Sequence, residues 1–177
     1  MKPSTSGLLL ALLATLLSFG IYFAFLKKDN YFYLDNPSDT LLEVRLNDKI
    51  YNLSPKQSLR LNLNKGKHII SVPSQNLDTF FVVTQNQGLV NPLRQTYVNY
   101  HRYYGVSQNK DSLITADSIK VDSVYYRGKG VVSNALYLED FYYGLDQDFE
   151  KIVKQDSLKT RSKIFRKRDF IDFYHSL

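Results

Sequence analysis

Residue types that carry catalytic or metal chemistry are few in this chain of 177 residues. It has no cysteine, and its three histidines, His68, His101 and His175, are widely separated along the chain. No two of them have the spacing that places a pair of imidazoles on one helix face, and no carboxylate cluster lies beside them in sequence. The sequence therefore predicts no metal site, no cofactor and no thiolate nucleophile.

Signatures of nucleophilic and phosphoryl chemistry are also missing, since the chain has no G-x-S-x-G turn and no phosphate-binding glycine loop. Glu139 and Asp140 are adjacent acidic residues, but neighbouring residues of a strand point to opposite faces, so the two carboxylates are not expected to flank one bond. We therefore predict a non-catalytic protein. The alternative is a small envelope hydrolase or glycan-modifying enzyme, which a pocket grouping Glu139, Asp140 or His101 with a second titratable side chain would favour.

A basic segment lies near the end of the chain. Lys159, Arg161 and Lys163 alternate, so a strand would place them on one face. Two interpretations stay open: contact with an anionic partner such as lipid headgroups, and a solvated strand edge whose charges deter edge-to-edge pairing. The six candidate contact residues for an anionic surface are Lys159, Arg161, Lys163, Arg166, Lys167 and Arg168.

The net charge of +6 is unevenly distributed along the chain. Residues 1–28 carry three lysines and no acid, residues 29–150 carry 12 Lys and Arg against 14 Asp and Glu, and residues 151–177 carry 8 against 3. Because the central part is not basic, the sequence predicts no nucleic-acid partner.

A short tripeptide, Asp-Ser/Thr-aliphatic, recurs five times. It resembles an O-glycosylation consensus of exported bacterial proteins, and sugar at such sites is a bulky surface modification. The other interpretation, in which Asp-Ser opens turns before strands, stays open. The candidate O-glycan acceptors are Thr40, Ser112, Ser118, Ser123 and Ser157.

The elements that position these residues are predicted to be strands. Leu42, Val44 and Leu46 alternate with polar residues, and similar short runs separated by turn signals continue through residues 31–106. Aromatic residues make up 14% of the chain and suit half-buried sheet surfaces. We predict a mainly β fold, an antiparallel β-sandwich or partly open barrel, with a short helix near the C-terminus in which Asp169 is the cap.

The N-terminal part differs from the rest. Residues 7–26 contain no charge and would span roughly 30 Å as a helix, so we predict a leader and single-pass transmembrane anchor within residues 1–28. A cleaved signal peptide is the alternative. One soluble domain is expected over residues 29–177, with a core at 31–106 and an elaborated half at 107–177. Leader length favours a cytoplasmic N-terminus and an exported domain, while the flanking lysines leave the orientation nearly undecided.

The stretch from Val44 to Val72 resembles the small β-sandwich repeats called PEGA-like domains. Leu46-Asn47-Asp48 stands for their first turn, Pro55 for their proline, and Leu63 with Gly66-Lys67-His68 for their second half. The first-turn glycine of that pattern is absent, as is the tyrosine after the last strand. The resemblance implies an envelope or surface interaction unit and implies no catalytic residues.

Taken together, these features predict a bacterial inner-membrane protein that presents a non-catalytic β-sandwich to another envelope protein or to a cell-wall component. A third interpretation keeps the domain in the cytoplasm, with its basic segment lying on anionic lipid.

Overall fold

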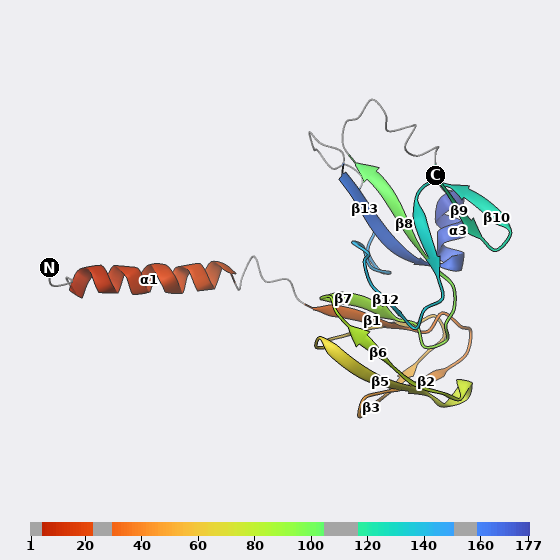
Figure 1. The fold of residues 1–177 in the computed structure, drawn as a ribbon, viewed down its shortest axis with the longest axis horizontal. Helices are drawn as coiled ribbons and strands as arrows, with labels where there is room; N and C mark the ends of the chain where they lie inside the picture. The colour runs from red at the N-terminus through yellow and green to blue at the C-terminus, as the bar shows by residue number, and fades with distance from the viewer. Residues whose placement is uncertain (1–4, 23–29, 105–116, 151–158) are drawn as a thin grey trace. The chain divides into compact units, whose positions relative to one another are not determined.

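The computed structural model describes residues 5–22, 30–104, 117–150 and 159–177 (Figure 1). The chain divides into two compact units, Met1–Asn30 and Tyr31–Leu177. Two of the candidate O-glycan acceptors, Ser112 and Ser157, lie outside the described residues.

The described part of the first unit is one helix, α1 (Thr5–Ile21), whose 17 residues contain no charge. At 1.5 Å per residue it extends about 25 Å. The hydroxyls of Thr15 and Ser18 donate hydrogen bonds to carbonyls four residues earlier, at 2.9 and 2.8 Å. Across the described residues, no helix is both long enough and apolar enough to cross a membrane. The transmembrane helix predicted over Gly7–Leu26 is therefore not supported, and its last residues, from 23 onward, lie outside the described part.

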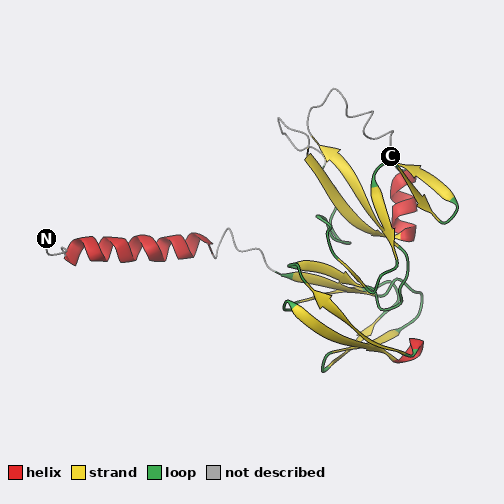
Figure 2. Ribbon diagram, viewed as in Figure 1, coloured by secondary structure: helices red, strands yellow, loops and turns green. Residues whose placement is uncertain are grey.

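The second unit is built mainly from strands, shown in yellow in Figure 2. One four-stranded sheet has the order β12-β7-β1-β4 and a second has the order β3-β2-β5-β6. The strands of the first are β12 (Tyr137–Leu138), β7 (Gln87–Val90), β1 (Tyr31–Asp35) and β4 (Ser58–Leu61). Those of the second are β3 (Lys49–Leu53), β2 (Leu42–Leu46), β5 (Gly66–Val72) and β6 (Leu77–Val83).

These two sheets share one hydrophobic core, to which β1 contributes Phe32 and Leu34 and β5 contributes Ile70. The alternation seen in the sequence explains this packing, because Leu42, Val44 and Leu46 of β2 are all buried while the residues between them are not. A two-residue turn at Asn47-Asp48 joins β2 to β3, and Asn47 adopts the left-handed conformation (φ 53°) that asparagine tolerates well.

The remaining elements of the second unit surround a second core, rich in aromatic side chains. A three-stranded sheet has the order β11-β8-β13, and β9 and β10 form a hairpin. Phe170 of the C-terminal helix α3 is fully buried against Tyr100, Tyr126 and Phe165. The bounds are β8 (Tyr97–Tyr104), β9 (Ser118–Val121), β10 (Val124–Arg127), β11 (Gly130–Ser133), β13 (Lys159–Arg166) and α3 (Lys167–His175). The 3-10 helix η2 (Pro73–Gln75) lies outside this group, between β5 and β6.

The prediction of a mainly β fold with a short C-terminal helix is confirmed. The described strands form several sheets and no closed barrel. Two details differ from the prediction. The pair β1–β7 is parallel, because the five intervening strands return the chain in the same direction. Asp169 was expected to cap the final helix, but α3 begins earlier, after Arg166, and Asp169 lies in its first turn.

Candidate functional site

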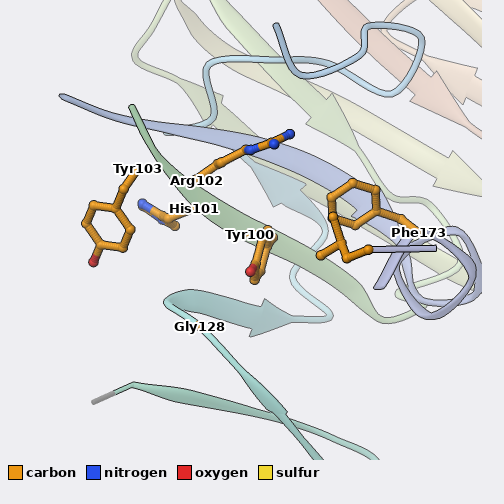
Figure 3. Close-up of a pocket in the computed structure, with 7 residues that line it drawn as sticks. Tyr100, His101, Arg102, Tyr103, Gly128 and Phe173 are labelled. Carbon is orange, nitrogen blue, oxygen red and sulfur yellow. The ribbon is translucent and has the colours of Figure 1, made fainter. Parts of the chain in front are cut away.

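The first candidate site is a cavity of about 240 Å³ beside β8 (Figure 3). Its walls come from four consecutive residues of β8, from the turn after β10, and from the C-terminal helical segment. Figure 3 shows His101 and Tyr103 leaving β8 on one side and Arg102 on the other. The lining residues are Tyr100, His101, Arg102, Tyr103, Gly128, Phe173 and Leu177.

Gly128 is essential to the shape of this cavity. Its φ of +121° is rarely adopted by residues with a side chain, and a Cβ there would lie 2.7 Å from the Tyr100 hydroxyl. The chain therefore reverses at Gly128 and brings β11 alongside β8, where the Lys129 carbonyl accepts a hydrogen bond from the His101 backbone N–H at 2.9 Å.

The cavity has aromatic and cationic walls, and none of the described residues that line it is acidic. Burial lowers the pKa of His101, assisted by the nearby Lys129 charge, and burial raises the pKa of Tyr100. Both side chains are therefore neutral near pH 7 and can donate or accept hydrogen bonds. Such walls can hold an aromatic or anionic group.

The acidic pair predicted from sequence does not reach this cavity. Glu139 accepts a hydrogen bond from the Thr84 hydroxyl at 2.7 Å, and Asp140 accepts one from the Gln85 side chain. Among the described residues, no three His, Asp or Glu side chains gather closely enough to hold a metal ion. Glu139 and Asp140 do not line the cavity beside β8. His101 does, together with the titratable side chains Tyr100, Arg102 and Tyr103, so the kind of grouping that favours the enzyme alternative is present there without a described carboxylate.

The predicted basic segment forms β13 and the start of α3, and most of its charges are paired within the chain. Arg161 lies 2.8 Å from Glu150, Lys163 lies 3.3 Å from Asp148, and Lys167 lies 3.1 Å from Asp122. Lys159 and Arg168 are exposed. The segment thus offers an anionic surface less charge than its sequence indicates.

Arg166, the remaining cation, belongs to a buried network. Its guanidinium contacts both carboxylate oxygens of Asp35, at 2.5 and 2.8 Å, and donates to the Lys56 carbonyl at 2.9 Å. The Tyr97 hydroxyl donates to the same carboxylate at 2.5 Å, and Asp35 itself is fully buried. Burial, followed by the charge of Asp35, raises the pKa of Tyr97. The network ties β13 and β8 to β1, which is a structural role.

His68 is also structural, because it links two turns of the second sheet. Its Nδ1 lies 3.0 Å from the Asn47 side-chain amide, and its Nε2 lies 2.8 Å from the Asn64 carbonyl. The ring is buried and stacks on Phe81 with centroids 5.5 Å apart.

Three candidate O-glycan acceptors are described, and all three are exposed. Thr40 precedes β2, Ser118 begins β9, and Ser123 lies in the two-residue turn between β9 and β10. Asp122 in that turn has a left-handed backbone (φ 53°). Both interpretations of the tripeptide remain compatible with these positions, so glycosylation stays a prediction.

The strongest candidate for an interaction surface is the outer face of the sheet β3-β2-β5-β6, which the sequence interpretation missed. Ile50, Ile69, Phe80 and Val82 project from this face with exposed fractions of 60, 57, 53 and 48%. The opposite face of the same strands forms the core. A signal was available, because Ile69-Ile70 and Phe80 to Val83 are continuous apolar runs, so these strands are apolar on both faces.

Fold and surface together define a mainly β protein with a four-stranded sheet that exposes apolar side chains to solvent. Comparisons with protein-family models, with curated proteins and with solved structures found no match.

Proposed function

We propose that this chain is a non-catalytic binding protein of the bacterial cell envelope, whose β-sandwich domain contacts another protein through the outer face of β3-β2-β5-β6. The observation that carries this proposal is the exposure of Ile50, Ile69, Phe80 and Val82 on one face. Grouped exposed apolar side chains on a folded domain are typical of protein interaction sites. The resemblance of residues 44–72, which form most of this sheet, to envelope interaction modules supports the same function.

Attachment to the inner membrane by the N-terminal segment, with the domain on the outside, is part of the proposal. The support is the composition of α1, which carries seven leucines that are each more than half exposed: Leu8, Leu9, Leu10, Leu12, Leu13, Leu16 and Leu17. A helix that is apolar on all sides favours lipid or protein surroundings over water. The Asp-Ser/Thr-aliphatic tripeptides, if glycosylated, agree with export.

Photo-crosslinking in intact cells tests the binding function. A photoreactive residue replaces Ile50 on the proposed surface, and the same residue replaces Tyr125 of β10 as a control of similar exposure, at 60 and 67%. We expect a discrete adduct with another envelope protein at position 50 and none at position 125. Equal labelling at both positions, or none at either, would contradict the proposed surface.

Protease treatment of intact spheroplasts tests the topology separately. Cleavage of the β domain by added protease is expected if the domain is exported. A domain that stays uncut until the spheroplasts are lysed would instead agree with the cytoplasmic orientation.

A further inference from the structure

Strand β6 is an open edge of its sheet. It pairs with β5 along seven residue pairs, Gly66–Val83 to Val72–Leu77, and it has no second neighbour among the described strands. The backbone groups on its outer side are therefore available to another strand.

The sequence of β6 offers little protection to this edge. Proteins block such edges with charged side chains, especially lysine, with proline, or with very short strands. Of the other edges, β3 has five residues and contains Lys49, β4 has four and contains Arg60, and β12 has only two residues. Strand β6 is longer, seven residues that read LDTFFVV, and its single charge, Asp78, is followed by five uncharged residues. Seven residues with high β-propensity and little charge favour strand pairing.

The outer-facing residues of this edge are arranged in rows. Phe80 lies opposite Ile69 of β5, Val82 lies opposite Lys67, and Asp78 lies opposite Ser71. The Lys67 ammonium lies 4.1 Å from the centre of the Phe80 ring, so this cation extends toward β6.

We propose that β6 pairs in antiparallel orientation with β6 of a second copy of this chain, about a two-fold axis at Phe80. This pairing joins two four-stranded sheets into one sheet of eight strands. It places Phe80 opposite Phe80 of the second copy, so that the central row reads Ile69, Phe80, Phe80, Ile69. It also places Asp78 of each copy opposite Val82 of the other.

Charge complementarity favours a second copy as the partner strand at this edge. The row of side chains beside the Phe80 pair runs from Lys67 to Val82 of one copy and on to Asp78 and Ser71 of the second copy. Lys67 and the Asp78 of the second copy are therefore two strands apart, about 9.6 Å between backbones. Lysine and aspartate side chains reach across that distance. Within one copy the two residues lie in rows four residues apart, about 13 Å along the strand, so the pair can form only between copies. The two-fold axis generates this ion pair twice.

Disulfide formation by a single engineered cysteine tests the dimer, since the chain has no cysteine of its own. In the full-length chain, in its membrane fraction, Phe80→Cys places two thiols directly opposite each other, at Cβ separations of about 5 Å. The control is Ile50→Cys, which has similar exposure on the same face but lies on β3. Across the proposed dimer the two β3 strands are seven strand spacings apart, about 34 Å.

Under mild oxidation we expect Phe80→Cys to form a disulfide-linked dimer at least tenfold faster than Ile50→Cys, as measured on non-reducing gels. Equal rates in the two variants, or no dimer from Phe80→Cys, would overturn the proposal. This result is independent of the proposed binding function, because heterologous photo-adducts at position 50 do not require a free β6 edge.

A charge exchange tests the register. In the Phe80→Cys background, Asp78→Lys is expected to slow cross-linking several-fold, since it faces Lys67 of the second copy, and adding Lys67→Asp is expected to restore the rate. If Asp78→Lys has no effect, or if the second change slows the reaction further, the antiparallel register about Phe80 is wrong.

Discussion

Replacing Arg166 by methionine tests the buried network that connects β1 with β8 and β13. The substitution removes two contacts to the Asp35 carboxylate and one to the Lys56 carbonyl. Methionine is close to the arginine stem in length, so the loss of packing is small compared with the loss of charge. What remains is a fully buried carboxylate whose only other side-chain partner in the described structure is the Tyr97 hydroxyl.

The expected cost follows from this burial. Removing one partner of a buried ion pair costs about 3–5 kcal/mol, whereas breaking an exposed pair costs about 0–1 kcal/mol. The Asp35 side chain is 0% exposed and that of Arg166 is 19% exposed, so the buried range applies. Because domains of this size are stable by about 5–15 kcal/mol, the variant loses a large share of its stability, and its Tm falls by on the order of 10 °C.

Thermal and urea unfolding of the full-length chain, followed by circular dichroism, provide the measurement. The control is Arg45→Met, which breaks the exposed Arg45–Glu43 pair, 3.1 Å long. The double variant Asp35→Asn/Arg166→Met no longer buries an uncompensated charge, so it should recover about 1 kcal/mol or more relative to Arg166→Met. A loss in Arg166→Met no larger than that in Arg45→Met would refute the reasoning.

Three further predictions concern stability. Gly128→Ala should destabilise the chain by about 2 kcal/mol or more in urea unfolding, because backbone strain at a positive φ adds to a clash of the new Cβ with Tyr100. Gly66→Ala is the control, since Gly66 has a similar φ but no atom near its Cβ position, so backbone strain alone should cost about 1 kcal/mol. Asn36→Ala should cost about 2–3 kcal/mol, since the buried Asn36 amide donates to three carbonyls; a neutral result would show that these bonds contribute nothing. The raised pKa of Tyr97 means that the folded state keeps the phenolic proton more tightly than the unfolded chain, whose tyrosines titrate near 10. Stability is therefore fully present below about pH 10 and falls as the pH rises further, and Tyr97→Phe should flatten that fall.

The alternating pattern of the sequence predicted some strands of the first core, such as β2, but not β7, whose residues 87–90 read as part of a polar loop. Leu42, Val44 and Leu46 alternate with polar residues in the sequence, and they are the buried residues of β2 in the structure. The turn at Asn47-Asp48 lies where the polar residues indicate it. Local spacing determines which face of a strand an apolar residue occupies, so these features need no knowledge of distant partners.

Partner choice between distant segments could not be predicted in this way. Asp35 and Arg166 are 131 positions apart, and nothing in the local sequence of either residue indicates the other. The same holds for the parallel pairing of β1 with β7, since each strand alone is compatible with either direction. The exposed face of β5 and β6 was missed for a different reason: a continuous apolar run does not reveal which of its two faces is covered.

The uneven charge of the chain has a structural explanation in these pairings. The acidic excess of residues 29–150 and the basic excess of residues 151–177 lie on segments that the fold brings together, so Asp122, Asp148 and Glu150 each meet a cation of the C-terminal segment at 2.8–3.3 Å. Cations paired at such distances bind an outside anion less strongly, because binding must first break or share the internal ion pair. A run of basic residues in the sequence therefore predicts an anion-binding surface only when the acidic residues that pair with it inside the fold are known. Of the six cations in β13 and the start of α3, only Lys159 and Arg168 have no anionic partner among the described residues. The main role of the other four is therefore to hold the β domain together.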